Sequence, residues 1–117
     1  MNSFHRSHLD GNAVMVCQDN LTFMRSLEGE SMQLIVTSPP YNIGKAYEAR
    51  SSLDAYVNSQ AQVIAQCVRL LRPRGSLCWQ IGNHVQSGEI FPLDIVLYPI
   101  FQKHGLKLRN RIVWHYP

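Results

Sequence analysis

Two adjacent prolines, Pro39 and Pro40, follow directly on a short apolar run at residues 34–36. Neither proline nitrogen carries a hydrogen to donate, and both φ angles are held at about −65°. A sheet ladder therefore ends here, and the next loop presents carbonyl oxygens beside the hydroxyl of Ser38 and the ring of Tyr41. Because ligands of α/β sheets bind outside the carboxyl ends of strands, this loop is placed where a binding site is expected.

The residue types of this loop suit one class of ligand. Hydroxyl and carbonyl oxygens accept hydrogen bonds from an amino group, while an aromatic ring stacks on a planar heterocycle. An enzyme that acts on the exocyclic amine of a nucleobase, taken out of its stack, needs both features. The alternative interpretation of the loop is an ordinary rigid turn. We favour the functional one, because the loop directly follows a buried type of strand.

Composition limits the remaining possibilities. The chain has 117 residues, of which 45% are hydrophobic and 16% charged, as expected for one globular domain. Its net charge of +3 is compatible with a polyanionic partner but does not establish one. No apolar stretch approaches the roughly 18 residues of a membrane span, and the start lacks the apolar run of a signal peptide. We expect a cytoplasmic protein whose three cysteines are reduced and mostly buried, and no metal site.

Strand-like and helix-like segments alternate along the chain. Strands are expected at residues 13–17, 32–37, 76–81 and 106–115, and helices at 20–27, 53–71 and 91–104. Pro99 should kink the last helix or cut it short. Residues 1–11 are polar and expected to be loose, so the folded part is 12–117. The alternation predicts an α/β fold, with a mostly parallel sheet flanked by helices.

The clearest helical pattern lies between Ser52, a potential N-cap, and the Arg-Pro-Arg-Gly sequence at residues 72–75 that should stop the helix. Its apolar residues recur in steps of four and three, which marks one face of a helix. The predicted buried face consists of Leu53, Val57, Ala61, Ile64, Val68 and Leu71.

Four stretches of the chain resemble the DNA amino-methyltransferases that modify cytosine N4 or adenine N6. They are Gln-Asp-Asn-Leu at residues 18–21, Thr-Ser-Pro-Pro-Tyr-Asn-Ile-Gly-Lys at 37–45, Val-Arg-Leu-Leu-Arg-Pro-Arg-Gly at 68–75, and Leu-Arg-Asn-Arg-Ile-Val-Trp-His at 108–115. They follow the family's own order, and the layout resembles the β arrangement, in which the catalytic half comes first. The resemblance implies an incomplete Rossmann-like methyltransferase fold that uses S-adenosylmethionine.

The resemblance also implies roles for single residues. Ser38 through its side chain, and Pro39 through its backbone carbonyl, should accept hydrogen bonds from the target amine. Tyr41 should stack on the flipped base, with Pro40 shaping the loop. Asp19 should lie near the adenine amino group of the cofactor.

Thr37, like Asp19, is expected to contribute to cofactor binding. Asp19 has a structural alternative, because an Asp before a helical run is a common N-cap. The partner is expected to be double-stranded DNA, and the residues expected to contact it are Asn42, Lys45, Asn83, Arg109 and Arg111. A surface turn at Asn83 and a solvated strand edge at the basic residues are the structural alternatives.

The first residue of the Ser-Pro-Pro-Tyr sequence bears on the target base. Asp or Asn is the more usual residue there in adenine-N6 enzymes, whereas Ser38 resembles the cytosine-N4 group. Cytosine N4 is therefore favoured, with adenine N6 as the alternative.

The chain departs from the family pattern at the cofactor. The family's glycine-rich loop has a G-x-G spacing, but the seven glycines here, at positions 11, 29, 44, 75, 82, 88 and 105, have none. We therefore expect weak or absent binding of S-adenosylmethionine, and no activity from this chain alone. It is expected to be the N-terminal catalytic half of a methyltransferase, or one half of a split enzyme completed by a second chain. The alternatives are a non-catalytic nucleic-acid-binding module and an inactive truncated remnant.

Overall fold

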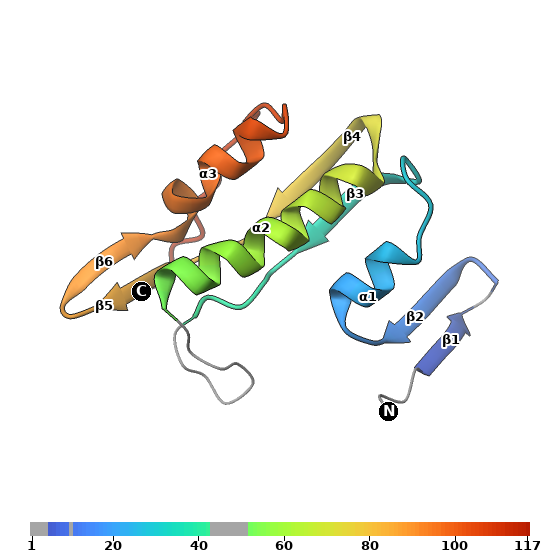
Figure 1. The fold of residues 1–117 in the computed structure, drawn as a ribbon, viewed down its shortest axis with the longest axis horizontal. Helices are drawn as coiled ribbons and strands as arrows, with labels where there is room; N and C mark the ends of the chain where they lie inside the picture. The colour runs from blue at the N-terminus through green and yellow to red at the C-terminus, as the bar shows by residue number, and fades with distance from the viewer. Residues whose placement is uncertain (1–4, 10, 43–51) are drawn as a thin grey trace. The chain divides into compact units, whose positions relative to one another are not determined.

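The structure, a computed structural model, describes residues 5–9, 11–42 and 52–117, and of residues 5–9 the backbone alone. The chain divides into two compact units, Met1–Thr37 with Gln62–Trp79 and Ser38–Ala61 with Gln80–Pro117. Figure 1 shows how helices and strands alternate along it. No helix among the described residues is long and apolar enough to span a membrane.

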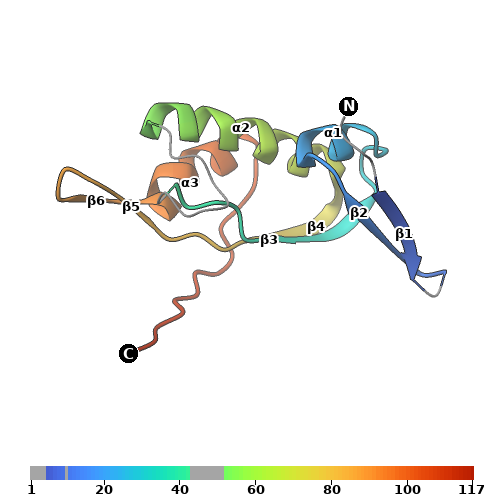
Figure 2. The ribbon, with the colours of Figure 1, turned by 90° about the horizontal axis from the view of Figure 1, so that it is seen from below.

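A pair of parallel strands forms the centre of the first unit. Strand β3 (Met32–Thr37) pairs with β4 (Leu71–Trp79), and helix α2 (Leu53–Leu70) lies between them in the sequence. Parallel strands need such a crossover connection, so this is a βαβ arrangement. The second half of α2 lies on one face of the strand pair (Figures 1 and 2). The predicted α/β class with parallel pairing is confirmed.

The two strands differ in how well the sequence predicted them. The bounds of β3 are those expected, but β4 begins at Leu71 instead of Ser76. The register shifts between Met32, which faces Leu71, and Leu34, which faces Ser76. The Arg-Pro-Arg-Gly segment therefore ends the helix as expected, yet it continues as an irregular part of the strand. A bulge accommodates a proline that has no N–H for the ladder.

The N-terminal strands form a hairpin. Strand β1 (His5–Leu9) pairs antiparallel with β2 (Ala13–Cys17), across a turn in which Gly11 has a φ of 70°. The expectation of a loose segment at residues 1–11 was wrong for β1. Strand β2 was predicted, but as a buried strand, whereas Val14 and Met15 are exposed. The backbone of β2 pairs with β1. The alternation of strands and helices could not indicate this pairing, because it predicted no strand before β2.

Helix α1 (Asn20–Arg25) has only six residues and depends on partners at both ends. At its start, Asp19 Oδ2 accepts hydrogen bonds from the backbone N–H and the hydroxyl of Thr22, both at 3.0 Å. At its end, the guanidinium of Arg69 donates to the carbonyls of Met24 at 2.7 Å and Leu27 at 3.1 Å. These bonds satisfy backbone groups that a helix leaves unpaired at its termini.

The second unit contains a hairpin and a helix. Strands β5 (Asn83–Gln86) and β6 (Glu89–Pro92) pair antiparallel, and the turn between them has φ of 52° at Ser87 and 78° at Gly88. No strand was expected between residues 81 and 106. The Ser-Gly pair was the overlooked signal, because positive φ at both turn residues suits a two-residue hairpin.

Helix α3 (Leu93–Lys103) occupies most of the predicted 91–104 segment. Pro99 lies inside it without cutting it short. The strand expected at residues 106–115 was wrong, because residues 106–117 form neither helix nor strand. Figure 2 shows this segment as a coil that leads away from α3. Its apolar side chains are exposed, Ile112 to 84% and Trp114 to 75%, and no described segment pairs with it.

The buried face of α2 differs by about one position from the predicted one. The buried residues are Tyr56, Gln60, Ile64, Cys67 and Leu70. Of the predicted face, Ile64 is buried, as is Leu71 just beyond the helix, whereas Leu53, Val57, Ala61 and Val68 are half-buried. The pattern counted Tyr56 and Gln60 as surface residues because their side chains end in polar groups.

The three cysteines were expected to be mostly buried. Cys67 is buried, and this burial raises the pKa of its thiol to about 11. Cys17 and Cys78 are exposed, so the expectation was wrong for these two. All three are free thiols in the structure.

Gly75 should not tolerate a side chain. A Cβ there would lie 2.9 Å from Leu71 Cδ2 and 3.1 Å from the carbonyl oxygen of Gln33. We expect Gly75→Ala to lower the free energy of unfolding by about 1–3 kcal/mol, the usual cost of overpacking. Urea denaturation measures it. The control is Gly29→Ala, where the nearest atom, the carbonyl oxygen of Arg69, is 3.5 Å away; equal effects of both changes would contradict the prediction.

Asp19 should make the stability of the chain depend on acid. The hydrogen bonds from the backbone and the side chain of Thr22 hold the pKa of Asp19 below its usual value of 3.8. A lowered pKa in the folded state adds stability above the unfolded value, which is lost as the pH falls through the folded pKa. Asp19→Asn keeps an oxygen for the cap but does not titrate. We therefore expect the wild type to lose its advantage over Asp19→Asn between neutral pH and about pH 2. Urea midpoints across this range test it, and a pH-independent difference would contradict it.

Candidate functional site

The Ser-Pro-Pro-Tyr loop directly follows β3 and folds back on itself. Ser38 Oγ lies 3.2 Å from the phenol oxygen of Tyr41, and either hydroxyl can donate in this hydrogen bond. Ser38 is exposed and Tyr41 is half-buried. The bond therefore fixes the hydroxyl of Ser38 next to the aromatic ring, with the two prolines between them. A hydroxyl, two carbonyls and a ring are thus gathered within four residues.

The first turn of α2 holds one side of this loop. The phenol hydroxyl of Tyr56 donates a hydrogen bond of 2.6 Å to the carbonyl oxygen of Pro40. Tyr56 is 5% exposed, so water competes little for this bond. The helix start is itself fixed, because Ser52 Oγ accepts a hydrogen bond from the backbone N–H of Ala55 at 3.2 Å. The predicted capping role of Ser52 is confirmed.

The start of β5 holds the other side of the loop. A Cβ at Gly82 would lie 3.0 Å from Cδ2 of Tyr41, so the ring packs directly on the glycine backbone. His84 Nδ1 lies 3.0 Å from the carbonyl oxygen of Asn42, and His84 is 1% exposed. A carbonyl only accepts, so Nδ1 carries the proton in this bond. Asn42 itself has a φ of 58°, a left-handed conformation that this contact supports.

The structure brings some of the predicted site residues together. The residues from Ser38 to Asn42 form one loop. Gly82 and His84 both contact this loop, and Asn83 stands between them in the sequence. Asn83 therefore lies beside the loop, and its predicted DNA contact stays a prediction. Asn83 is exposed, whereas Asn42 is 2% exposed. Burial favours a structural role for Asn42, and its predicted DNA contact stays a prediction.

The other predicted residues belong to other elements of the chain. Asp19 is exposed and caps α1, and Thr37 is the last residue of β3, opposite Trp79 in β4. Arg109 is exposed. Arg111 is engaged in an ion pair, its Nε lying 2.9 Å from Oδ2 of Asp94. Lys45 lies outside the described residues.

Three residues that contact the loop were not among the predicted site residues: Tyr56, Gly82 and His84. Only the position of Gly82 and His84, just after a predicted strand, offered a signal. Tyr56 offered none, because its contact with Pro40 joins residues from different elements.

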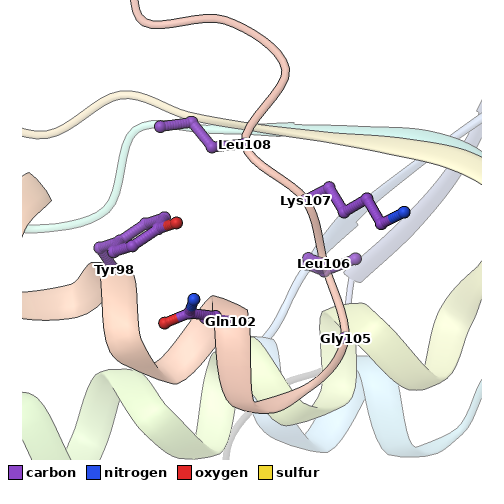
Figure 3. A pocket seen from close by; sticks show the side chains of 6 residues that line it. All are labelled: Tyr98, Gln102, Gly105, Leu106, Lys107 and Leu108. Atoms are coloured by element: carbon purple, nitrogen blue, oxygen red, sulfur yellow. The ribbon is translucent and has the colours of Figure 1, made fainter.

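A hollow lies beside helix α3, away from the loop residues, as shown in Figure 3. It has a volume of about 430 Å³. Its lining residues are Tyr98, Gln102, Gly105, Leu106, Lys107 and Leu108 (Figure 3). They include a single charged group and no pair of groups suited to acid–base or nucleophilic catalysis, so this hollow does not compete with the loop as the candidate site.

The residues present fit only one end of S-adenosylmethionine. The exposed carboxylate of Asp19 bonds to Thr22 through Oδ2 alone, so its other oxygen can accept a bond from an adenine amino group. No G-x-G sequence occurs among the 117 residues to surround the methionine end.

Two curated relatives are similar to most or nearly all of the chain. The type II methyltransferase M.BglII of Bacillus subtilis is 42% identical over 116 residues, which cover 98% of this chain and 31% of the relative. The DNA adenine methyltransferase YhdJ of Escherichia coli is 31% identical, over 84% of this chain and 31% of the relative. The chain thus spans about a third of the length of these relatives.

A solved structure has the same fold. It belongs to a Thermus thermophilus protein assigned as a DNA modification methylase, with a TM-score of 0.64 and 29% identity. The similarity covers 79% of this chain and 38% of that one. A second structure of the same protein, complexed with S-adenosylmethionine, has a TM-score of 0.60 and 26% identity, and covers 74% and 38%.

A family model described as DNA methylase, of N6 and N4 type, matches residues 32–117. The match includes the loop at residues 38–42, both parallel strands, and the hairpin that contacts the loop. The predicted resemblance is confirmed, and the chain belongs to the N6/N4-type DNA methylase family.

Proposed function

We propose that this chain provides the base-holding part of a DNA methyltransferase, which transfers a methyl group to the exocyclic amine of a base flipped out of double-stranded DNA. The observation that carries the proposal is the hydrogen bond between Ser38 and Tyr41 in a loop fixed by Tyr56 and His84. This bond holds the hydroxyl of Ser38 beside the ring of Tyr41, which supports roles as an acceptor and as a stacking surface. The family membership of the chain supports the same reaction.

The loop would act on the amine by accepting its hydrogens. A nucleobase amine is a poor nucleophile, because its lone pair is delocalised into the ring. Acceptors at Ser38 Oγ and at the Pro39 carbonyl would hold both N–H bonds out of the ring plane and so localise the lone pair. Tyr41 would stack on the base and fix its distance. Positioning and electrostatics would then supply most of the acceleration.

S-adenosylmethionine, when bound, supplies the electrophilic methyl group on its sulfonium. In this chain, Asp19 would accept a hydrogen bond from the adenine amino group, and Thr37 would lie near it. A second region, in the same or another chain, would have to supply the glycine-rich loop. We therefore propose that the 117 residues alone bind the cofactor weakly and transfer no methyl group.

The exposed polar residues would contact the DNA. Asn83 stands at the edge of the loop, and Arg109 is exposed on the segment after α3. Arg111 would have to exchange Asp94 for a phosphate, which a surface ion pair permits because it contributes little stability. Phosphate contacts of this kind position the duplex without selecting a sequence.

We favour cytosine N4 as the target, because Ser38 stands where adenine-N6 enzymes more usually have Asp or Asn. The alternative target is adenine N6, and the similarity to the E. coli DNA adenine methyltransferase supports it. Mass spectrometry of the methylated product distinguishes the two bases. The other alternative is a non-catalytic nucleic-acid-binding module, which would bind DNA without methyl transfer even when completed.

Methyl transfer from labelled S-adenosylmethionine to mixed duplex DNA tests the proposal. The chain alone should be inactive, whereas the chain joined to the region that it leaves uncovered in the B. subtilis relative should be active. Tyr41→Ala should lower kcat/KM of the joined enzyme about 5- to 150-fold, since a base–aromatic stack contributes about 1–3 kcal/mol. Pro39→Ala should also lower it.

The matched control is Tyr116→Ala, because Tyr116 is 77% exposed. It should leave kcat/KM unchanged. Full activity of the joined enzyme after both Tyr41→Ala and Pro39→Ala would show that the loop does not hold the base.

A further inference from the structure

We infer that Tyr56 and His84 are positioning residues that decide which oxygens of the loop are open to the target amine. Together they form a loop clamp, defined here as Tyr56 on the Pro40 carbonyl and His84 on the Asn42 carbonyl. The inference rests on the proposed function, because it concerns the same base-holding loop.

The oxygens of the loop differ in whether another group already bonds to them. The carbonyl of Pro40 is occupied by the phenol of Tyr56, and that of Asn42 by the imidazole of His84. The described residues give the Pro39 carbonyl no hydrogen bond. Ser38 Oγ is exposed and, among the described residues, bonds only to the Tyr41 hydroxyl. Among the described residues, Ser38 Oγ and the Pro39 carbonyl therefore keep acceptor capacity for a ligand, one acceptor for each N–H bond of an amine.

Tyr56 is suited to this task by its position. Its hydroxyl lies 2.6 Å from the Pro40 oxygen, at the short end of the range for O–H···O bonds. It is 5% exposed and lies in the first turn of a helix whose start is capped by Ser52. The peptide plane between Pro40 and Tyr41 is thus tied to a rigid element. That plane sets where the Tyr41 ring and the preceding Pro39 carbonyl can lie.

His84 fixes the other end of the loop. It is 1% exposed, and its ring lies 6.2 Å from the ring of Phe91 on the neighbouring strand, so the imidazole has little freedom to turn. Its bond to the Asn42 carbonyl holds a residue with positive φ directly after Tyr41. Gly82, two residues earlier, lets the Tyr41 ring approach the backbone. The ring is therefore held between two fixed carbonyls, that of Pro40 just before Tyr41 and that of Asn42 just after it.

The clamp can be tested in the 117-residue chain without any ligand. Tyr56→Phe removes only the hydroxyl, and carbonyl ¹³C NMR reports each proline directly. We expect the Pro40 carbonyl resonance to move upfield and the Tyr41 amide signal to broaden. The control is Tyr98→Phe on α3, the same chemical change on an exposed tyrosine, which should leave both signals in place.

His84 has its own conservative variant. Asn places an amide N–H near the position of Nδ1, so His84→Asn should retain the Asn42 carbonyl resonance, whereas His84→Ala should shift it upfield. Retained Pro40 and Asn42 resonances in Tyr56→Phe and His84→Ala would overturn the clamp.

The joined enzyme separates positioning from folding. Tyr56→Phe should lower kcat about 10- to 100-fold with little change in the KM for DNA, because misplaced acceptors weaken the reaction more than the binding. An unchanged kcat per folded enzyme would overturn the inference. A wild-type joined enzyme without any transfer would contradict the proposed function instead, and the carbonyl spectra would then decide the clamp by themselves.

Discussion

Two prolines in a row deprive the loop after β3 of backbone donors, and the rest of the site follows from this constraint. A loop normally gains rigidity from N–H groups that bond to nearby carbonyls. Pro39 and Pro40 have none, so side chains must take over. Tyr56 from α2 and His84 from β5 do so, each from a separate element. The loop's conformation therefore depends on the tertiary fold and not on its own sequence alone.

The loop carries no charged acceptor, so its hold on an amine depends strongly on the rigidity that Tyr56 and His84 provide. A carboxylate forms charge-assisted hydrogen bonds that are roughly twice as strong as those between neutral groups. Ser38 offers only a hydroxyl, and its orientation depends on the bond to Tyr41. A weaker acceptor holds an amine well only if its direction is fixed in advance. A rigid loop and a neutral acceptor are thus two parts of the same arrangement.

Local patterns in the sequence predicted the parts of the fold that are locally determined. The bounds of β3 follow from an apolar run and the prolines that end it, and the caps at Asp19 and Ser52 follow from residue type. The edge that joins the loop to Asn83 follows from the rule that parallel strands end together. Each of these depends on neighbours in sequence or on a general rule of topology.

The missed features depend on segments far apart in the chain. A strand is a property of two segments, so the β-type pattern at residues 106–115 cannot form one when no described segment pairs with it. The contact of Tyr56 with Pro40 likewise joins residues 16 positions apart. In a helical pattern Tyr56 reads as a surface residue, because its polar tip hides an apolar ring. The buried position of Tyr56 is explained by the Pro40 carbonyl, which accepts the hydrogen bond of its hydroxyl. The residue that holds the loop is therefore one that the helical periodicity assigns to the solvent-exposed face.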